Sequence, residues 1–249
     1  MNKTFFILAV CFLLAIKTAH SSTVDVGVSE VLEGNMISMD VDSSSNLVKF
    51  SSEFYNMGSV PYKARIKTEI YNNTHLIFGG WNDEKDFMPG DKKMFDSYWY
   101  ANAAGDYFVK IKVYFGNDIK EYKKVGFSVE NIADSEDIFG IKNFRTYDNY
   151  VLFDLESSED ANNIVIIPFQ YKAGWIFEQK VIENMAKDSS KYIMLNYYPS
   201  LWSPSTVKLA IASDNGKYYS EKTLEMNKIT GLTGLFYYIT DTIKYALFK

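Results

Sequence analysis

The stretch Pro89–Phe115, PGDKKMFDSYWYANAAGDYFVKIKVYF, decides the fold of this chain. After the Gly105-Asp106 turn, apolar residues occupy every second position, namely Tyr107, Val109, Ile111, Val113 and Phe115. The positions between them are Phe108, Lys110, Lys112 and Tyr114. Successive side chains of a strand point to opposite faces, so an apolar residue at every second position indicates a half-buried antiparallel strand. The stretch therefore predicts an all-β protein.

The same pattern continues through the first half of the chain. Strand-like segments alternate with turns such as Asn56–Ser59, Asn72-Asn73 and Gly116–Asp118. About seven to nine strands in about a hundred residues, with a turn every ~8–12 residues, are typical of an immunoglobulin-like β-sandwich. We expect this sandwich to span residues 22–131.

The second half of the chain predicts a second sandwich over residues 141–227. An acidic segment at 132–140 precedes it and is interpreted as the linker. Residues 163–170, NIVIIPFQ, are almost continuously apolar, which indicates a strand buried on both faces, with an edge or bulge at Pro168. Residues 176–186 fit a strand or a helix, and Asp214-Asn215-Gly216 predicts a hairpin turn. No residue-level repeat of the first half is visible.

Residues 228–249 show a helical period instead. The apolar positions recur at steps of three and four and comprise Leu232, Leu235, Phe236, Ile239, Ile243, Ala246 and Leu247. They predict a C-terminal amphipathic helix that packs on the second sandwich, makes peripheral contact with a membrane, or mediates self-association. Its internal charges argue against a transmembrane helix.

The N-terminus has the features of an export signal. Lys3 is followed by the apolar run Phe5–Ile16, which is too short to span a bilayer, and by small residues at 18–21. Residues 1–21 are therefore predicted to be a signal peptide, with an uncleaved anchor as the alternative. The only cysteine, Cys11, lies within this run, so no disulfide is expected in the mature chain. An exported protein held together without disulfides favours a prokaryotic cell surface.

Residues 45–130 resemble a CARDB-type module, a cell-adhesion-related immunoglobulin-like domain of archaeal and bacterial surface proteins. The matching positions are Asn56, Gly58, Gly90, Trp99, Gly105 and Tyr107. The acidic segment that often ends such modules is represented only by Asn117, Asp118 and Ile119. The resemblance implies a prokaryotic, archaeal surface protein that acts in adhesion and scaffolding, with no reaction to inherit.

Composition and motifs exclude several function classes. The net charge of −5 disfavours a nucleic-acid binder, which needs a concentrated positive surface. After the signal, His75 is the only histidine, so neither a hydrolytic triad nor a zinc site is indicated. Phosphate-binding glycine motifs are absent as well. These features predict a protein that is not an enzyme.

Calcium is the one metal for which the sequence offers ligands. Asp40, Asp42 and Ser44, followed by Asn46, place oxygen atoms at alternate positions, as calcium loops do. The loop lacks the glycine and the closing glutamate of such a site, and solvated acidic turns are the alternative. The acidic linker, with Asp134, Glu136 and Asp137, offers further carboxylates that would rigidify the junction by binding a divalent ion.

Two aromatic loops suggest contact surfaces. Trp81 follows two glycines, and Tyr197, Tyr198 and Trp202 surround a proline and two serines. Exposed aromatic side chains bind sugars or protein partners, while packing at the end of a core is the alternative. Asn72 begins a glycosylation sequon, which fits an exposed loop.

We therefore expect an extracellular, non-enzymatic protein of the cell surface or envelope. It would act in adhesion or as a structural scaffold through protein–protein contacts, with exposed edge strands able to pair with a partner. A carbohydrate-binding module that uses the loop tryptophans is the alternative. A hydrolase with two catalytic carboxylates comes third, because the spacing of the acidic residues selects no pair.

Overall fold

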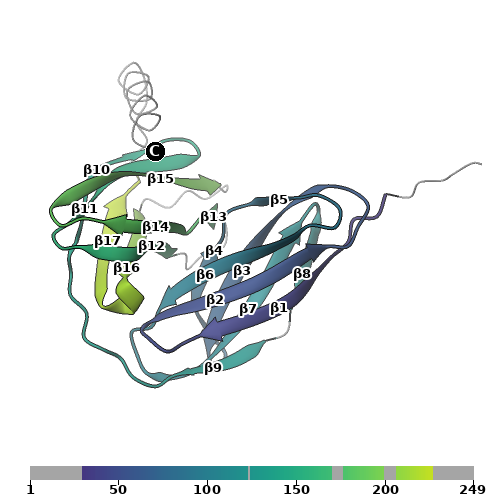
Figure 1. Cartoon of the computed structure of the whole chain (residues 1–249), viewed down its shortest axis with the longest axis horizontal. Helices are drawn as coiled ribbons and strands as arrows, with labels where there is room; N and C mark the ends of the chain where they lie inside the picture. The colour runs from purple at the N-terminus through teal and green to yellow at the C-terminus, as the bar shows by residue number, and fades with distance from the viewer. Residues whose placement is uncertain (1–29, 123, 170–175, 199–205, 227–249) are drawn as a thin grey trace, which may run out of the picture. The chain divides into compact units, whose positions relative to one another are not determined.

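The computed structural model describes residues 30–122, 124–169, 176–198 and 206–226 (Figure 1). Within these ranges every regular element is a β-strand, except for one 3-10 turn. All pairs of neighbouring strands are antiparallel, and the sheets face each other as sandwiches. The described chain is therefore all-β, as the alternating sequence pattern predicts.

The first sandwich contains nine strands. In chain order these are β1 (Gly34–Asp42), β2 (Leu47–Asn56), β3 (Tyr62–Asn72), β4 (His75–Trp81), β5 (Lys85–Phe87), β6 (Lys92–Tyr100), β7 (Gly105–Phe115), β8 (Asp118–Glu121) and β9 (Val125–Val129). One sheet has the order β1-β2-β6, and the other has the order β4-β3-β7-β8, with β5 paired to β3 and β9 paired to β7.

The second sandwich contains eight strands and the 3-10 turn. In chain order these are β10 (Phe139–Thr146), β11 (Tyr150–Ser157), β12 (Ala161–Phe169), β13 (Ile176–Phe177), β14 (Lys180–Met185), β15 (Ser189–Tyr198), β16 (Thr206–Ser213), the turn η1 (Asp214–Gly216) and β17 (Tyr218–Glu225). Its sheets have the orders β10-β11-β15-β13 and β14-β12-β16-β17.

The two sandwiches share one strand order. In each, the first, second and fifth main strands form one sheet, β1-β2-β6 and β10-β11-β15. The remaining main strands form the other, β4-β3-β7-β8 and β14-β12-β16-β17. This division of strands between two antiparallel sheets is an immunoglobulin-like arrangement. The two halves thus share a strand topology although the sequence shows no residue-level repeat.

The alternation that predicts the fold is realised in β7. Its five apolar residues of one face are all buried, whereas Phe108 on the other face is exposed. Trp99 on β6 also points inward, and its ring lies edge-on to Tyr107 with 4.9 Å between centroids. These residues belong to the core of the first sandwich.

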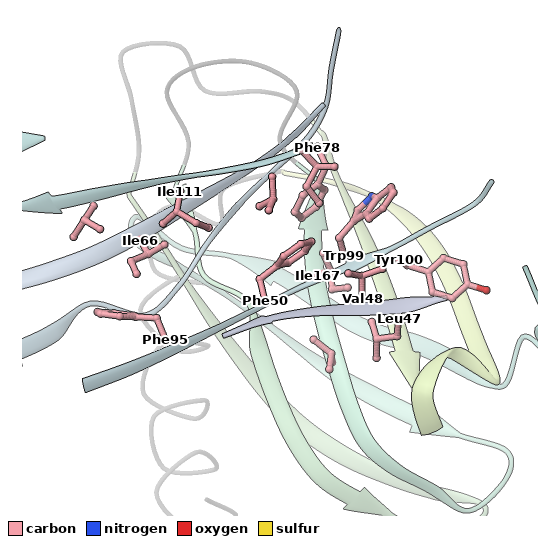
Figure 2. Close-up of a cluster of buried hydrophobic side chains, with 14 of the residues drawn as sticks. Leu47, Val48, Phe50, Ile66, Phe78, Phe95, Trp99, Tyr100, Ile111 and Ile167 are labelled. Carbon is pink, nitrogen blue, oxygen red and sulfur yellow. The ribbon is translucent and has the colours of Figure 1, made fainter. Parts of the chain in front are cut away.

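Strand β12 contributes to two cores, which explains its continuous apolar sequence. Ile164 and Ile166 lie in the core of the second sandwich, whereas Val165 and Ile167 lie in the core of the first. Figure 2 shows Ile167 in the same cluster as Val48, Phe50 and Trp99. The prediction of burial on both faces is confirmed, and the second face is covered by the first sandwich.

Neighbouring strand β16 follows the same rule. Leu209 and Ile211 point into the second core, and Ala210 and Ala212 point into the first. Both sandwiches lie within one compact unit that begins at Val31. The exact limits of two domains at 132–140 stay a prediction.

The predicted fold class requires one correction, because it included an amphipathic helix. No α-helix occurs in the described part of the chain. The described residues therefore include no helix that could cross a membrane. Residues 228–249, to which the helix was assigned, lie outside the described residues, as does the signal at 1–21. The fold class supported here is all-β alone.

The strand pairing tests three predictions for the second sandwich, which concern residues 176–186, Pro168 and the turn at 214–216. Within 176–186 the described elements are strands, β13 and β14. Pro168 pairs with Leu209 of β16, but pairing with β14 ends at Ile166, so the proline lies where β12 has one neighbour. The hairpin between β16 and β17 turns through Asp214, Asn215 and Gly216, all with positive φ.

Truncating a buried isoleucine side chain of β7 should destabilise the protein. Ile111 is 0% exposed in the first core, so Ile111→Ala should lower the free energy of unfolding by about 2–5 kcal/mol in urea titrations. The control is Ile119→Ala on neighbouring β8, where the side chain is 61% exposed and the expected change is below ~0.5 kcal/mol. Equal effects of the two substitutions would contradict this core assignment.

Candidate functional site

The described residues among the predicted aromatic contacts lie in strands rather than in loops. Trp81 ends β4 and is 8% exposed, with its ring 4.8 Å from that of Tyr114. Tyr197 lies in β15, is 1% exposed, and donates a hydrogen bond to the carbonyl oxygen of Tyr147. Tyr197 is therefore a core residue that a ligand cannot reach. Trp202 and the side chain of Tyr198 lie outside the described part of the chain.

The predicted calcium ligands follow one another along an edge strand and its turn. Asp40 and Asp42 are in β1, and Oδ1 of Asp42 accepts hydrogen bonds from the backbone N–H of Ser44 at 3.1 Å and from its hydroxyl at 2.7 Å. These bonds lower the pKa of Asp42. Among the described residues, no three His, Cys, Asp or Glu side chains gather in a metal-binding group.

Two other predicted features acquire a structural setting. Asn72 is exposed at the tight turn between β3 and β4, where a glycan would meet solvent. In the linker, Asp137 accepts hydrogen bonds from the hydroxyl of Ser220 and, at 3.1 Å, from the ammonium of Lys222. Asp137 thereby binds to β17, and these hydrogen bonds satisfy its carboxylate oxygens without a metal ion.

A hydrogen-bonded site joins the two sandwiches at residues 178 and 179. Oε1 of Gln179 accepts a hydrogen bond from the backbone N–H of Tyr98 at 2.8 Å, and Nε2 donates to the Tyr98 carbonyl at 2.7 Å. The side-chain amide thus takes the place of a strand partner along the open edge of β6. The backbone N–H of Gln179 also donates to the carbonyl of Trp81 at 3.0 Å.

Aromatic and amide contacts complete this junction. The rings of Tyr100 and Tyr219 stack with 3.7 Å between centroids, and Phe78 meets Phe169 edge-on at 6.0 Å. The amide of Asn46 pairs with both backbone groups of Ala133, at 2.7 and 3.0 Å, and so fastens the linker. Together with the shared core, these contacts connect the two sandwiches.

Two carboxylates face each other beside the Gln179 contact. Glu178 is 6% exposed and lines one cavity together with Asp83, from the connection between β4 and β5. Burial and then the Asp83 carboxylate raise the pKa of Glu178 to about 7. A cavity of about 190 Å³ adjoins the pair and is also lined by Lys180, Met194 and Asn196.

A separate charged site lies on the outer face of the β4-β3-β7-β8 sheet. Glu69 is 3% exposed and accepts hydrogen bonds from Lys67 at 2.8 Å, Lys112 at 3.0 Å and the Tyr71 hydroxyl at 2.9 Å. Burial alone would raise the pKa of Glu69, but these three donors outweigh it and lower the pKa to about 2. This carboxylate is thus a structural anchor for the sheet face.

Neither carboxylate site was anticipated from the sequence. Asp83 and Glu178 are far apart along the chain, and no spacing rule relates them. For Glu69 the sequence did contain a local signal. This residue occupies a solvent-facing position of an alternating strand, two residues after Lys67. Its burial depends on Lys112, which only the pairing of β3 with β7 brings near.

Removal of the Gln179 amide should loosen the junction. Gln179→Ala leaves the N–H and C=O of Tyr98 without these partners, so we expect a loss of about 1–3 kcal/mol in the free energy of unfolding. Hydrogen exchange at the Tyr98 amide should become faster. Glu183→Ala, at an exposed position of β14, serves as the control. Unchanged protection of Tyr98 in Gln179→Ala would refute the contact.

Acid should destabilise the protein through Glu69. The pKa of this group is lower in the folded state than its usual 4.5, so its contribution is present above pH 4.5 and is lost as the pH falls towards 2. Glu69→Gln should remove up to ~3 kcal/mol at neutral pH and flatten this part of the acid profile in thermal melts. Glu121→Gln, which removes the partner of Lys110 on the same sheet, should leave the profile nearly intact.

Comparisons with known proteins identify no family for this chain. No protein-family model and no curated protein matches its sequence. Similar solved structures include red sea bream transglutaminase, with 9% identity and a TM-score of 0.32 over 80% of this chain and 32% of that one. They also include CBD12 from CALX1.2, with 16% identity and a TM-score of 0.23 over 66% and 73%. A two-domain fibronectin type-III segment of chicken tenascin has 13% identity and a TM-score of 0.23 over 77% and 99%.

This chain spans about a third of the length of the transglutaminase. At such low TM-scores these likenesses carry no argument about function. The immunoglobulin-like fold of both halves is therefore based on their own strand order.

Proposed function

We propose that this protein is an exported, non-enzymatic component of the cell surface or envelope that acts in adhesion or as a structural scaffold. Its first sandwich would be a CARDB-type module of a prokaryotic, archaeal surface protein. One observation carries the scaffold role, namely the sheet that is shared between the two cores. Because β12 and β16 are covered on both faces, the sandwiches resist bending at their junction.

Partners would bind through protein–protein contacts at strand edges. Strand β1 pairs with β2 on one side only, and its bulge near Ile37 leaves that apolar side chain exposed. A partner strand could pair with such an edge, where backbone hydrogen bonds supply affinity and neighbouring side chains supply specificity. Asp40 and Asp42 on the same strand would restrict nonspecific pairing.

The carbohydrate-binding and hydrolase alternatives receive no support from Trp81 or from the Asp83–Glu178 pair. Trp81 is buried against Tyr114, so it offers little surface to a sugar. Glycoside hydrolysis requires two carboxylates that flank the scissile bond of a bound sugar, whereas Glu178 is only 6% exposed. The cavity beside them is smaller than the ~300 Å³ typical of ligand sites.

Surface labelling of the native host tests this proposal. On intact cells, a membrane-impermeant biotin reagent should label the protein, and the mature chain should begin near Ser22. If the host glycosylates exported proteins, Asn72→Gln should increase its electrophoretic mobility, with Asn73→Gln as the matched control in the same turn. Recovery of unlabelled protein from the cytosol, with residues 1–21 still attached, would disprove export.

A binding assay tests the contact mode. Ser38→Pro places a strand-breaking proline in β1. This variant should reduce adhesion of cells or cross-linking to surface neighbours, and the purified protein should remain folded. Normal adhesion with this variant would exclude the β1 edge. Retention on glycans that is lost in Trp202→Ala would instead favour carbohydrate binding.

A further inference from the structure

The carboxyl pair at the junction requires an explanation that stability alone does not supply. Glu178 lies between β13 and β14 and is almost fully buried, and Asp83 belongs to the connection between β4 and β5 of the other sandwich. Two ionised carboxylates that meet in one poorly solvated cavity repel each other strongly. A single shared proton converts this repulsion into a hydrogen bond.

The groups around Glu178 come from three directions. Asp83 and the backbone N–H of Glu84 approach from the first sandwich, and Nδ2 of Asn196 on β15 lies 3.4 Å from Oε2 of Glu178. Lys180 lines the same cavity, with its ammonium donating to the Met194 carbonyl at 3.1 Å. The remaining lining residues, Gln179, Met194 and Leu195, carry no charge.

We propose that Asp83 and Glu178 form a proton-operated latch that holds the two sandwiches together while one proton is shared and loosens their junction when that proton leaves. The latch is mechanically connected to the rest of the junction. Glu178 pairs with Trp81 of β4 in an isolated bridge, and the next residue, Gln179, holds the backbone of Tyr98. Repulsion at Glu178 therefore acts directly on the contacts that join the sandwiches.

The direction of the pH effect follows from the raised proton affinity of Glu178. The folded state binds this proton more tightly than an unfolded chain, in which the pKa would be near 4.5. The stabilisation is fully present below pH 4.5 and is lost as the pH rises through about 7. The latch is thus closed in mildly acidic medium and open in mildly alkaline medium, whether or not the protein is exported.

Hydrogen exchange of the full chain between pH 5.5 and 8.5 tests the latch. After correction for intrinsic exchange rates, protection of the Tyr98 and Gln179 amides should fall at least tenfold over this range. Amides in the middle of β7, such as Ile111, should keep their protection and report that the first core stays folded. Equal protection of Tyr98 at both pH values would overturn the proposal.

Two variants separate the latch from a general effect of pH. Glu178→Gln supplies a permanent donor to Asp83, so the Tyr98 amide should keep its pH 5.5 protection at pH 8.5. If this variant fails to fold, Asp83→Asn provides the same donor from the other side. Glu183→Gln, an exposed carboxylate on β14, should behave like the unmodified chain. A pH dependence that persists in both Glu178→Gln and Asp83→Asn would overturn the assignment to this pair.

Discussion

Burial of the β12–β16 sheet on both faces is the constraint on which the rest of this structure depends. On one face, these two strands direct isoleucine and leucine side chains into the second core. The face towards the first sandwich alternates small and medium residues, with Ala210 and Ala212 beside Val165 and Ile167. Small side chains bring the facing sheets close together, so apolar area is removed from water without a thick intervening layer. The two halves are consequently held by the same force that folds each of them.

A shared core places strict demands on the polar groups at its rim. Strand β6 ends its sheet at this junction, and the backbone of Tyr98 would lose hydrogen bonds to water without a substitute. The amides of Gln179 and Asn46 provide substitutes, because an amide offers a donor and an acceptor together. Glu178 and Asp83 differ from these amides, since two carboxylates offer only acceptors until one of them is protonated.

The sequence predicted what is local and missed what is not. Alternation in residues 107–115 and the apolar run at 163–170 are properties of single strands, and both were realised. The run could not reveal its second covering layer, because that layer comes from strands about a hundred residues earlier. Tyr197 was expected in a contact loop because Pro199 and Ser200 follow it, yet its side chain fills the core. Long-range pairing, as between Asp83 and Glu178, leaves no periodic signal at all.

The energetics of the junction argue that its carboxyl pair is more than a structural contact. A glutamine at position 178 would satisfy Asp83 at every pH, just as Gln179 satisfies Tyr98, whereas burying an acid costs stability whenever it ionises. An amide would therefore be the more stable choice in a junction required only to be rigid. Retaining an acid makes rigidity conditional on a proton, and the raised pKa of about 7 places that condition near neutrality. A scaffold built in this way would be stiff in one medium and compliant in another while both of its cores remain folded.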